Sequence, residues 1–188
     1  MHKIILASQS PRRMQLLKWA EVPFKIIASD VDESFPEGFP TDEVPVFIAK
    51  KKALSVQQKI NDDTQIILAA DTLVVLNNKI IGKPADRKQA LEILQSLSDK
   101  KHFVITGVTI LQGKTEINFS DTTEVTFHSL TNAQIEFYID KYKPYDKAGA
   151  YAIQEWIGVV GIKSVNGDFY NVMGLPISKV VQQLNKLM

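Results

Sequence analysis

The segment Ser8-Gln9-Ser10-Pro11-Arg12-Arg13 joins a short apolar run to the first turn of an expected helix. Free backbone N–H groups at a helix N-terminus attract anions, because the helix dipole places partial positive charge there. The hydroxyls of Ser8 and Ser10 can donate hydrogen bonds, and the guanidiniums of Arg12 and Arg13 can grip phosphate oxygens in pairs. The segment therefore predicts a phosphate-binding site, although a capped helix with two exposed arginines would have the same sequence.

The carboxylate of Asp71 follows the apolar run of residues 66–70, at the expected end of a buried strand. Strand ends are where α/β proteins place the side chains that meet a ligand. A carboxylate in that place can take a proton from water, so Asp71 is a candidate general base. The alternative is an aspartate that only caps a turn.

A second acidic cluster and several lysines complete the candidate groups. Asp30, Asp32 and Glu33 offer carboxylate oxygens, which are the ligands that Mg²⁺ prefers, although such clusters are usually solvated loops. Lysines at positions 50–52 and Lys83 add positive charge. A run of three lysines is typical of a solvated helix face, so at most one or two of them are expected to point inward.

Composition and missing motifs exclude several classes of protein. With 188 residues, 45% hydrophobic and 23% charged, the chain is typical of a folded globular protein. Its 22 Lys+Arg and 21 Asp+Glu leave a net charge of +1, which argues against binding along a nucleic-acid backbone. The absence of cysteine excludes disulfides, thiolate catalysis and cysteine-ligated metals. Without a P-loop, a Gly-x-Ser-x-Gly elbow or metal-ligand histidine spacing, P-loop kinases, serine hydrolases and zinc hydrolases are disfavoured.

Neither a signal peptide nor a membrane span is expected. Only four apolar residues, 4–7, precede the polar turn near the N-terminus, which is too few for the core of a signal peptide. The longest apolar runs are far shorter than the ~20 residues needed to cross a bilayer. We therefore expect a soluble protein of the cytoplasm that does not bind membranes.

Apolar patterning predicts strands that alternate with helices. Short apolar runs predict buried strands at residues 4–7, 24–28, 66–70, 72–76 and 79–81, and Asn77-Asn78 predicts a two-residue hairpin turn between the last two, because asparagine tolerates positive φ. Two longer runs, at residues 103–111 and 116–127, predict an antiparallel hairpin, and a last hairpin is expected from residues 159–165 and 169–172. Helices are expected over residues 11–20, 42–59, 86–97 and 131–141, and from Pro176 onward, with Asp86 opening the third and Thr131 capping the fourth.

This order of elements predicts the fold class. Because helices alternate with strands while hairpins join several strands, we expect an α/β fold with a mixed central sheet flanked by helices. No linker is evident, so residues 1–188 are expected to form a single domain with two lobes. The long strands between residues 100 and 130 are assigned to the second lobe, and the cleft between the lobes is the expected binding site.

Taken together and in this order, the segments resemble the Maf family of nucleoside triphosphate pyrophosphatases, nearly from end to end. The segments that carry the resemblance are Leu6-Ala7-Ser8-Gln9-Ser10-Pro11-Arg12-Arg13, Lys52-Ala53, Ala70-Asp71-Thr72, Lys83-Pro84, Ile105-Thr106-Gly107-Val108, Asp146-Lys147-Ala148-Gly149-Ala150-Tyr151, Ile153-Gln154 and Met173-Gly174-Leu175-Pro176. The resemblance implies an inosine triphosphatase-like architecture. It also implies hydrolysis between the α- and β-phosphates, which releases a nucleoside monophosphate and pyrophosphate and requires Mg²⁺ or Mn²⁺.

The same resemblance implies roles for five residues. Asp71 would be the proton acceptor that activates water. Arg13, Lys52 and Lys83 would hold the triphosphate and offset the charge that develops during in-line attack. Glu33, together with Asp71, would help to hold the metal ion.

Three further residues match the branch of the family that acts on dTTP and UTP: Arg12, Thr72 and Gln154. The branch associated with 7-methyl-GTP carries tryptophan at the first of these positions. After Gln154 the family tends toward glycine-rich residues, whereas this chain has Glu155-Trp156-Ile157. A pyrophosphatase directed at 7-methyl-GTP therefore stays an alternative to the leading hypothesis, which is a house-cleaning enzyme for pyrimidine triphosphates.

A function of another class also stays open. A nucleotide-sensing or cell-division-linked binding protein could use the same cleft with little catalysis. The placement of Asp71 beside the phosphates favours the enzyme, because a passive binder of a polyanion has little need for a carboxylate there. The expected partner is a nucleoside triphosphate, without nucleic acid, and the resemblance is compatible with a homodimer.

Overall fold

A mixed β-sheet is the central feature of the computed structural model, which describes residues 3–60 and 62–187. The strands lie in the order β2-β1-β3-β5-β6-β7, and β4 pairs with β3. They are β1 (Ile4–Leu6), β2 (Phe24–Ile26), β3 (Ile67–Leu76), β4 (Lys79–Ile81), β5 (Lys101–Gln112), β6 (Thr115–Phe127) and β7 (Ile162–Asn166). Because β1 is parallel to β2 and β3 while β3–β4 and β6–β7 are antiparallel, the predicted mixed sheet is confirmed.

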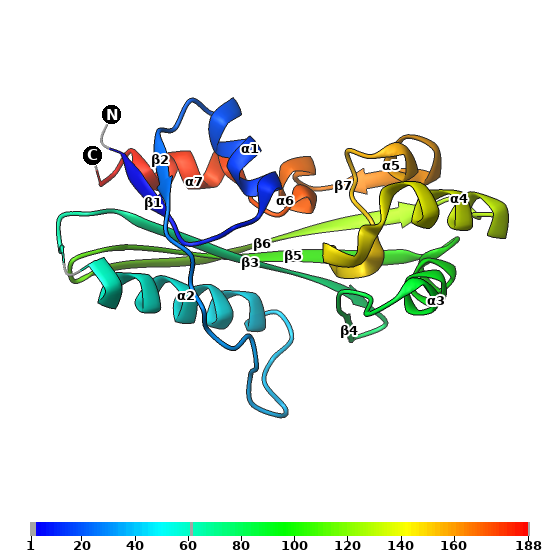
Figure 1. Cartoon of the computed structure of the whole chain (residues 1–188), viewed down its shortest axis with the longest axis horizontal. Helices are drawn as coiled ribbons and strands as arrows, with labels where there is room; N and C mark the ends of the chain where they lie inside the picture. Colours follow the sequence, from blue (N-terminus) through cyan, green and yellow to red (C-terminus); the bar gives the residue numbers. More distant parts are fainter. Residues whose placement is uncertain (1–2, 61, 188) are drawn as a thin grey trace. The chain divides into compact units, whose positions relative to one another are not determined.

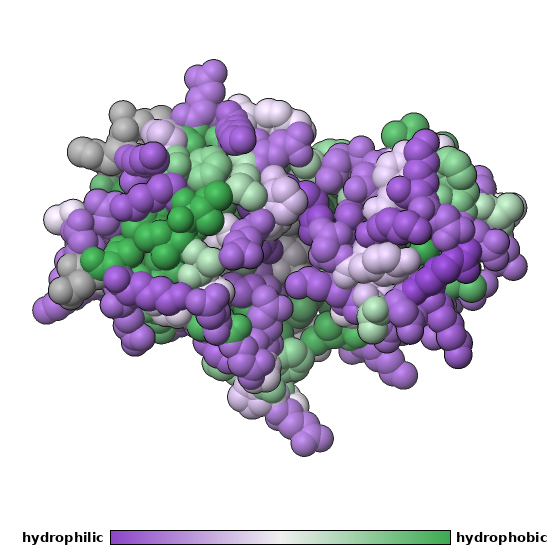
Figure 2. Space-filling model, in the orientation of Figure 1, coloured by the Kyte–Doolittle hydropathy of each residue, from purple (hydrophilic) through white to green (hydrophobic). Residues whose placement is uncertain are grey.

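Helices flank this sheet, as the sequence predicted. They are α1 (Pro11–Trp19), α2 (Val44–Ile60), α3 (Arg87–Leu97), α4 (Asn132–Tyr142), α5 (Trp156–Gly161), α6 (Phe169–Met173) and α7 (Ile177–Leu184), with short 3-10 turns η1 (Pro144–Asp146) and η2 (Ala148–Ala150). Across the described residues, each helix is too short or too polar to span a membrane. The face shown in Figure 2 is mainly hydrophilic, with its broadest apolar area in the region of β2.

The chain forms two compact units. Unit 1 takes its described residues from Met1–Thr72, Thr106–Asp121 and Gly174–Met188, and unit 2 consists of Leu73–Ile105 and Thr122–Met173. The long strands β3, β5 and β6 contribute residues to both units, so the expectation that the strands between residues 100 and 130 belong to a second lobe was wrong for β5 and β6, which only partly lie in unit 2. The reason is their length, since the 12 residues of β5 extend for about 40 Å, more than one small core requires. The expectation of a single domain stays a prediction.

In unit 1, α2 covers one face of the sheet, and α1 and α7 cover the other (Figure 1). Ala53 and Val56 of α2 pack in one buried cluster with sheet residues that include Ile67. Gly107 of β5 permits a close approach to the start of α2, because a Cβ there would lie 2.2 Å from the carbonyl carbon of Pro45 and from the backbone nitrogen of Val46. This approach fixes where α2, and with it Lys52, lies on the sheet.

In unit 2, local signals in the sequence determine the ends of several elements. Asn77 and Asn78 both have positive φ, as the predicted hairpin turn requires. Asp86 caps α3 by accepting a hydrogen bond from the backbone of Gln89. Thr131 caps α4 through a reciprocal pair of bonds with Gln134. These boundaries agree with the sequence prediction because each depends on neighbouring residues.

The predicted last hairpin was wrong. Residues 156–161 and 169–173 are the helices α5 and α6, and only β7 between them is a strand, which pairs with β6. In α6, the buried amide of Asn171 donates hydrogen bonds to the Val104 carbonyl and to Oγ1 of Thr123, each at 3.0 Å. These tertiary contacts outweigh the β-propensity of Phe169, Tyr170 and Val172.

Residues 66–76 also differ from expectation, because β3 is one continuous strand and Asp71 lies inside it. The parallel neighbour β1 ends opposite Leu68, three residues before Asp71. The chain then leaves the sheet, passes through Ser8 and continues into α1. Asp71 thus lies beyond the end of its neighbouring strand, although not at the end of its own.

Candidate active site

One buried lysine in unit 1 joins two carboxylates. The ammonium of Lys52 lies 2.7 Å from Oδ1 of Asp71 and 2.6 Å from Oε1 of Glu33. Lys52 in α2 and Asp71 in β3 are buried, whereas Glu33 in the loop after β2 is exposed. Of the three consecutive lysines, Lys52 is therefore the inward-pointing one that the sequence allowed, and it places a positive charge directly on the candidate base.

Arg13 is a second buried cation in unit 1. Its guanidinium donates from Nε to the Gly174 carbonyl at 2.8 Å, from Nη1 to Ser8 Oγ at 3.1 Å and from Nη2 to Thr72 Oγ1 at 3.1 Å. Burial lowers the pKa of Arg13, and the Asp71 carboxylate acts in the opposite direction. Since a guanidinium has five N–H donors, at most two remain for a phosphate. Arg13 thus links the start of α1 to β3 and to the segment at Gly174 through hydrogen bonds, in addition to supplying positive charge.

The hydroxyl of Thr72 is occupied by protein groups. It accepts from Arg13, lies 2.9 Å from the hydroxyl of Thr106 and 3.4 Å from the carbonyl of Gly174. A hydroxyl has one proton to donate and two lone pairs that can accept, and these three partners use all of them. A direct contact between this hydroxyl and a base would therefore require one of these bonds to break.

Thr106 and Gly174 were missed as site residues by the sequence analysis. Both lie in segments that carry the family resemblance, which was the available signal. Gly174 has a φ of 114°, a value that favours glycine, and this conformation accompanies the carbonyl's contacts with Arg13 and Thr72.

The start of α1 shows how the other predicted phosphate ligands lie. Oγ of Ser8 accepts from the backbone N–H of Ser10 at 3.2 Å and from Arg13. Ser10 occupies the N-cap position, but its hydroxyl makes no capping hydrogen bond, contrary to the expectation of a capped helix. Arg12 is half-buried, and its charge helps to lower the pKa of Arg13. The first turn of α1 is therefore basic and lacks a side-chain cap.

Lys83 and Gln154 belong to unit 2. Lys83 is exposed between β4 and α3, directly after Gly82, whose carbonyl accepts a hydrogen bond from Gly149 at 3.1 Å. Gln154 is exposed on the turn that precedes α5. The remaining predicted site residues lie together in unit 1 through the contacts described above.

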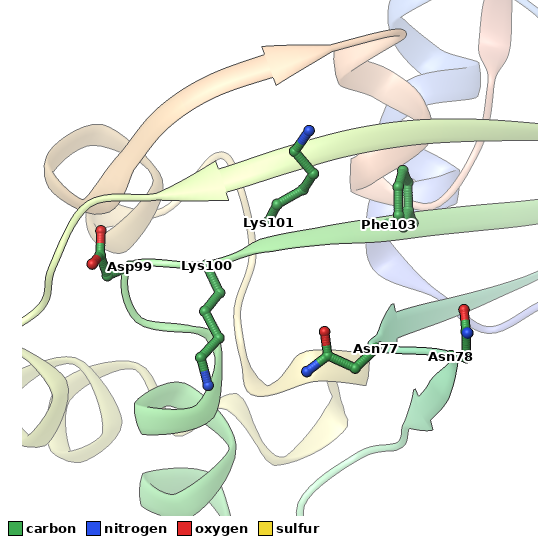
Figure 3. Close-up of a pocket in the computed structure, with 6 residues that line it drawn as sticks. All are labelled: Asn77, Asn78, Asp99, Lys100, Lys101 and Phe103. Atoms are coloured by element: carbon green, nitrogen blue, oxygen red, sulfur yellow. The ribbon is translucent and has the colours of Figure 1, made fainter.

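A hollow in unit 2 does not contain any of the predicted site residues. It is lined by Asn77, Asn78, Asp99, Lys100, Lys101 and Phe103 (Figure 3). The ammonium groups of Lys100 and Lys101 point away from each other, and Lys101 pairs with Glu124 at 3.0 Å. These two cations therefore do not converge on one anion.

The carboxylates beside Lys52 are candidate ligands for a divalent metal ion. Among residues 3–60 and 62–187, no group of three or more His, Cys, Asp or Glu side chains could hold a metal ion. Glu33 and Asp71 nevertheless place two carboxylates on one ammonium. Mg²⁺ is usually bound by one or two carboxylates together with substrate phosphates. The pair therefore fits a metal that is bound jointly with a polyphosphate.

Comparisons with known proteins show the family of this chain. A dTTP/UTP pyrophosphatase of Parabacteroides distasonis is 46% identical over 184 residues, covering 97% of this chain and 95% of that protein. A second, of Cytophaga hutchinsonii, is 48% identical over 184 residues, covering 98% of this chain and 84% of that protein. A solved nucleoside-triphosphatase / dITP/XTP pyrophosphatase from Mycobacterium abscessus has a TM-score of 0.41 and 11% identity over 69% of this chain and 76% of its own. The family model described as Maf-like protein matches residues 3–187, and the chain belongs to this family.

Proposed function

We propose that this protein hydrolyses nucleoside triphosphates, dTTP and UTP foremost, to the nucleoside monophosphate and pyrophosphate. Family membership and the names of its relatives support this activity. The observation that carries the proposal is the buried contact of Lys52 with Asp71, with Glu33 on the same ammonium. We further expect a cytoplasmic enzyme, and a homodimer stays a prediction.

The triphosphate is proposed to bind at the start of α1. The N–H groups of the first turn lack a side-chain cap and carry the positive end of the helix dipole. Arg12, the remaining N–H groups of Arg13, and the hydroxyls of Ser8 and Ser10 can bind phosphate oxygens. Lys83 is proposed to supply a further cation.

Asp71 is proposed to accept the proton of the attacking water. Lys52 engages Oδ1, so Oδ2 is the oxygen proposed to take the proton. The water oxygen forms a bond to phosphorus while the bond to the departing pyrophosphate oxygen breaks, and the ammonium of Lys52 is close enough to offset the developing charge. Mg²⁺ or Mn²⁺, held by Glu33 and Asp71, would supply further charge neutralisation on the phosphate oxygens.

Arg12, Thr72 and Gln154 are proposed to determine the choice of base. The hydroxyl of Thr72 is already bonded to Arg13 and Thr106. Thr72 is therefore proposed to act indirectly, by holding Arg13 and with it the position of the neighbouring Arg12, and Gln154 is proposed to contact the base directly.

The test is product identification with dTTP, UTP, CTP, GTP and 7-methyl-GTP, each with Mg²⁺ or Mn²⁺. We expect pyrophosphate from dTTP and UTP, and loss of turnover with retained nucleotide binding in Asp71→Asn. Asp63→Asn, an exposed aspartate of unit 1, is the matched control and should keep full activity. Full activity of Asp71→Asn would show that the base is misassigned. Binding without turnover of any nucleotide would support the sensor hypothesis.

A further inference from the structure

A turn in unit 2 presents Gln154 from an otherwise buried segment. Tyr151, Ala152 and Ile153 are buried, whereas Gln154 is exposed. The backbone N–H of Glu155 donates to the Ala152 carbonyl at 3.1 Å and closes the turn. Gln154 is thus an exposed amide side chain at the corner of a hydrogen-bonded turn.

The hydroxyl of Tyr138 binds both sides of this turn. It accepts a hydrogen bond from the backbone N–H of Ala152 at 3.2 Å and donates to Oε2 of Glu155. Tyr138 lies in α4 and is fully buried. The other carboxylate oxygen of Glu155 lies 3.6 Å from the ammonium of Lys147. One phenol therefore connects the residues on either side of Ile153 and Gln154.

Two further contacts hold the same turn. Gly158 of α5 packs directly on the Ile153 carbonyl, because a Cβ at this glycine would lie 1.8 Å from that oxygen. The hydroxyl of Tyr151 is 2.7 Å from Nε2 of the buried His102. The backbone that carries Gln154 is consequently restrained by neighbours from α4, α5 and β5.

We propose that Tyr138 and Glu155 are positioning residues that fix Gln154 for recognition of the uracil or thymine base; this rests on the proposed function. A glutamine amide offers one acceptor and two donors. Uracil presents an N3–H donor and an O4 acceptor, whereas cytosine presents an N3 acceptor and an amino donor. A mobile Gln154 could rotate to suit either base. Discrimination therefore requires a fixed backbone from which the amide has few orientations.

The first test compares Tyr138→Phe with Tyr142→Phe by the ratio of kcat/KM for UTP to that for CTP. Tyr138→Phe removes only the hydroxyl that binds the turn, and Tyr142→Phe removes a hydroxyl from the same helix while leaving those bonds in place. We expect the ratio to fall about fivefold in Tyr138→Phe, toward that of Gln154→Ala, and to stay unchanged in Tyr142→Phe. An unchanged ratio in Tyr138→Phe, with a lowered ratio in Gln154→Ala, would overturn the proposal.

Variants of Glu155 separate positioning from general destabilisation. Glu155→Ala removes the acceptor of the Tyr138 hydroxyl and should lower the ratio as Tyr138→Phe does. Glu155→Gln keeps an oxygen acceptor at the same place and should restore most of the ratio. The double variant Tyr138→Phe with Glu155→Ala should lose less than the product of the two single losses, because both remove the bond between Tyr138 and Glu155. Independent, multiplying losses would contradict this shared role.

Amide hydrogen exchange distinguishes this proposal from the proposed function. In Tyr138→Phe, exchange of the Ala152 and Glu155 amides should be faster, whereas Tyr142→Phe should match the wild type. A wild-type chain that hydrolyses no nucleotide would overturn the proposed function and, with it, the role in base choice. Unchanged exchange in Tyr138→Phe would overturn the positioning role whatever the activity.

Discussion

Nη2 of Arg13 and Oγ1 of Thr72 are 3.1 Å apart, which links the first turn of α1 to the residue that follows Asp71 in β3. The same guanidinium reaches Gly174, 161 residues away in the sequence. The proposed phosphate-binding segment and the proposed base are therefore positioned by one buried side chain. This relationship connects the stability of unit 1 to its proposed chemistry.

Arg13→Lys tests that connection. An ammonium cannot make the three divergent hydrogen bonds of the buried guanidinium, so we expect the free energy of unfolding to fall by about 2 kcal/mol. The activity should fall for every nucleotide, since Arg13 is not proposed to read the base. Urea unfolding measures the stability, with Arg12→Lys at the neighbouring half-buried position as control. Equal free energies of unfolding in the two variants would show that the hydrogen bonds of Arg13 do not stabilise unit 1.

Lys52→Met tests the shared cation. This change leaves the carboxylates of Asp71 and Glu33 without their common ammonium, and we expect the hydrolysis rate to fall at least about 100-fold. Lys51→Met is the matched control, because Lys51 contacts the Ser34 carbonyl from the adjacent position of α2. The control should stay within about threefold of the wild type. A similar fall in hydrolysis rate in both variants would attribute the effect to the loop that contains Glu33 and Ser34, and not to the cation of Lys52.

His102 predicts a loss of stability in acid. Burial lowers the pKa of His102 to about 4 from an ordinary value of 6.5, so the folded chain disfavours its protonation. Between these values the unfolded chain binds the additional proton, and stability therefore falls as the pH decreases from 6.5 toward 4. The full contribution is about 3 kcal/mol.

Urea unfolding at pH 7.5 and pH 5 measures this effect. His102→Gln can still bond to Tyr151 but does not titrate, so its stability should depend less on pH. His128→Gln, at an exposed position, should behave as the wild type. The same pH dependence in His102→Gln as in the wild type would show that another group is responsible.

Gly158→Ala tests the packing of α5 against the turn. The added methyl group would lie 1.8 Å from the Ile153 carbonyl oxygen, so the backbone must shift. We expect the free energy of unfolding to fall by about 2–3 kcal/mol. Gly82→Ala is the control in the same unit, because a Cβ there meets nothing within 4 Å. If both changes cost the same, the close contact at Gly158 would have no energetic consequence.

The structure shows what Glu155 and Trp156 contact in the segment where this chain departs from the glycine-rich family pattern. Glu155 directs its carboxylate to Tyr138 and Lys147 inside unit 2. The Glu155 side chain therefore stabilises the turn that carries Gln154. Trp156 packs edge-to-face on Phe137, with ring centroids 4.8 Å apart.

By itself, the sequence determined the features that depend on neighbouring residues. The caps at Asp86 and Thr131 and the turn at Asn77 and Asn78 were all predicted, because side-chain capping and positive φ act over a few residues. Family motifs likewise identified Asp71 as a candidate base from the chain alone.

Only the tertiary structure decided the contacts that are distant in sequence. The choice of Lys52 among three lysines depends on how α2 packs at Gly107, and the occupied hydroxyl of Thr72 depends on Arg13, Thr106 and Gly174. Residues 156–173 form two helices around one strand because Asn171 and Gly158 meet backbone groups elsewhere in unit 2. Such contacts exist only after the chain has folded, since buried polar groups take their partners from whichever segments the fold places beside them.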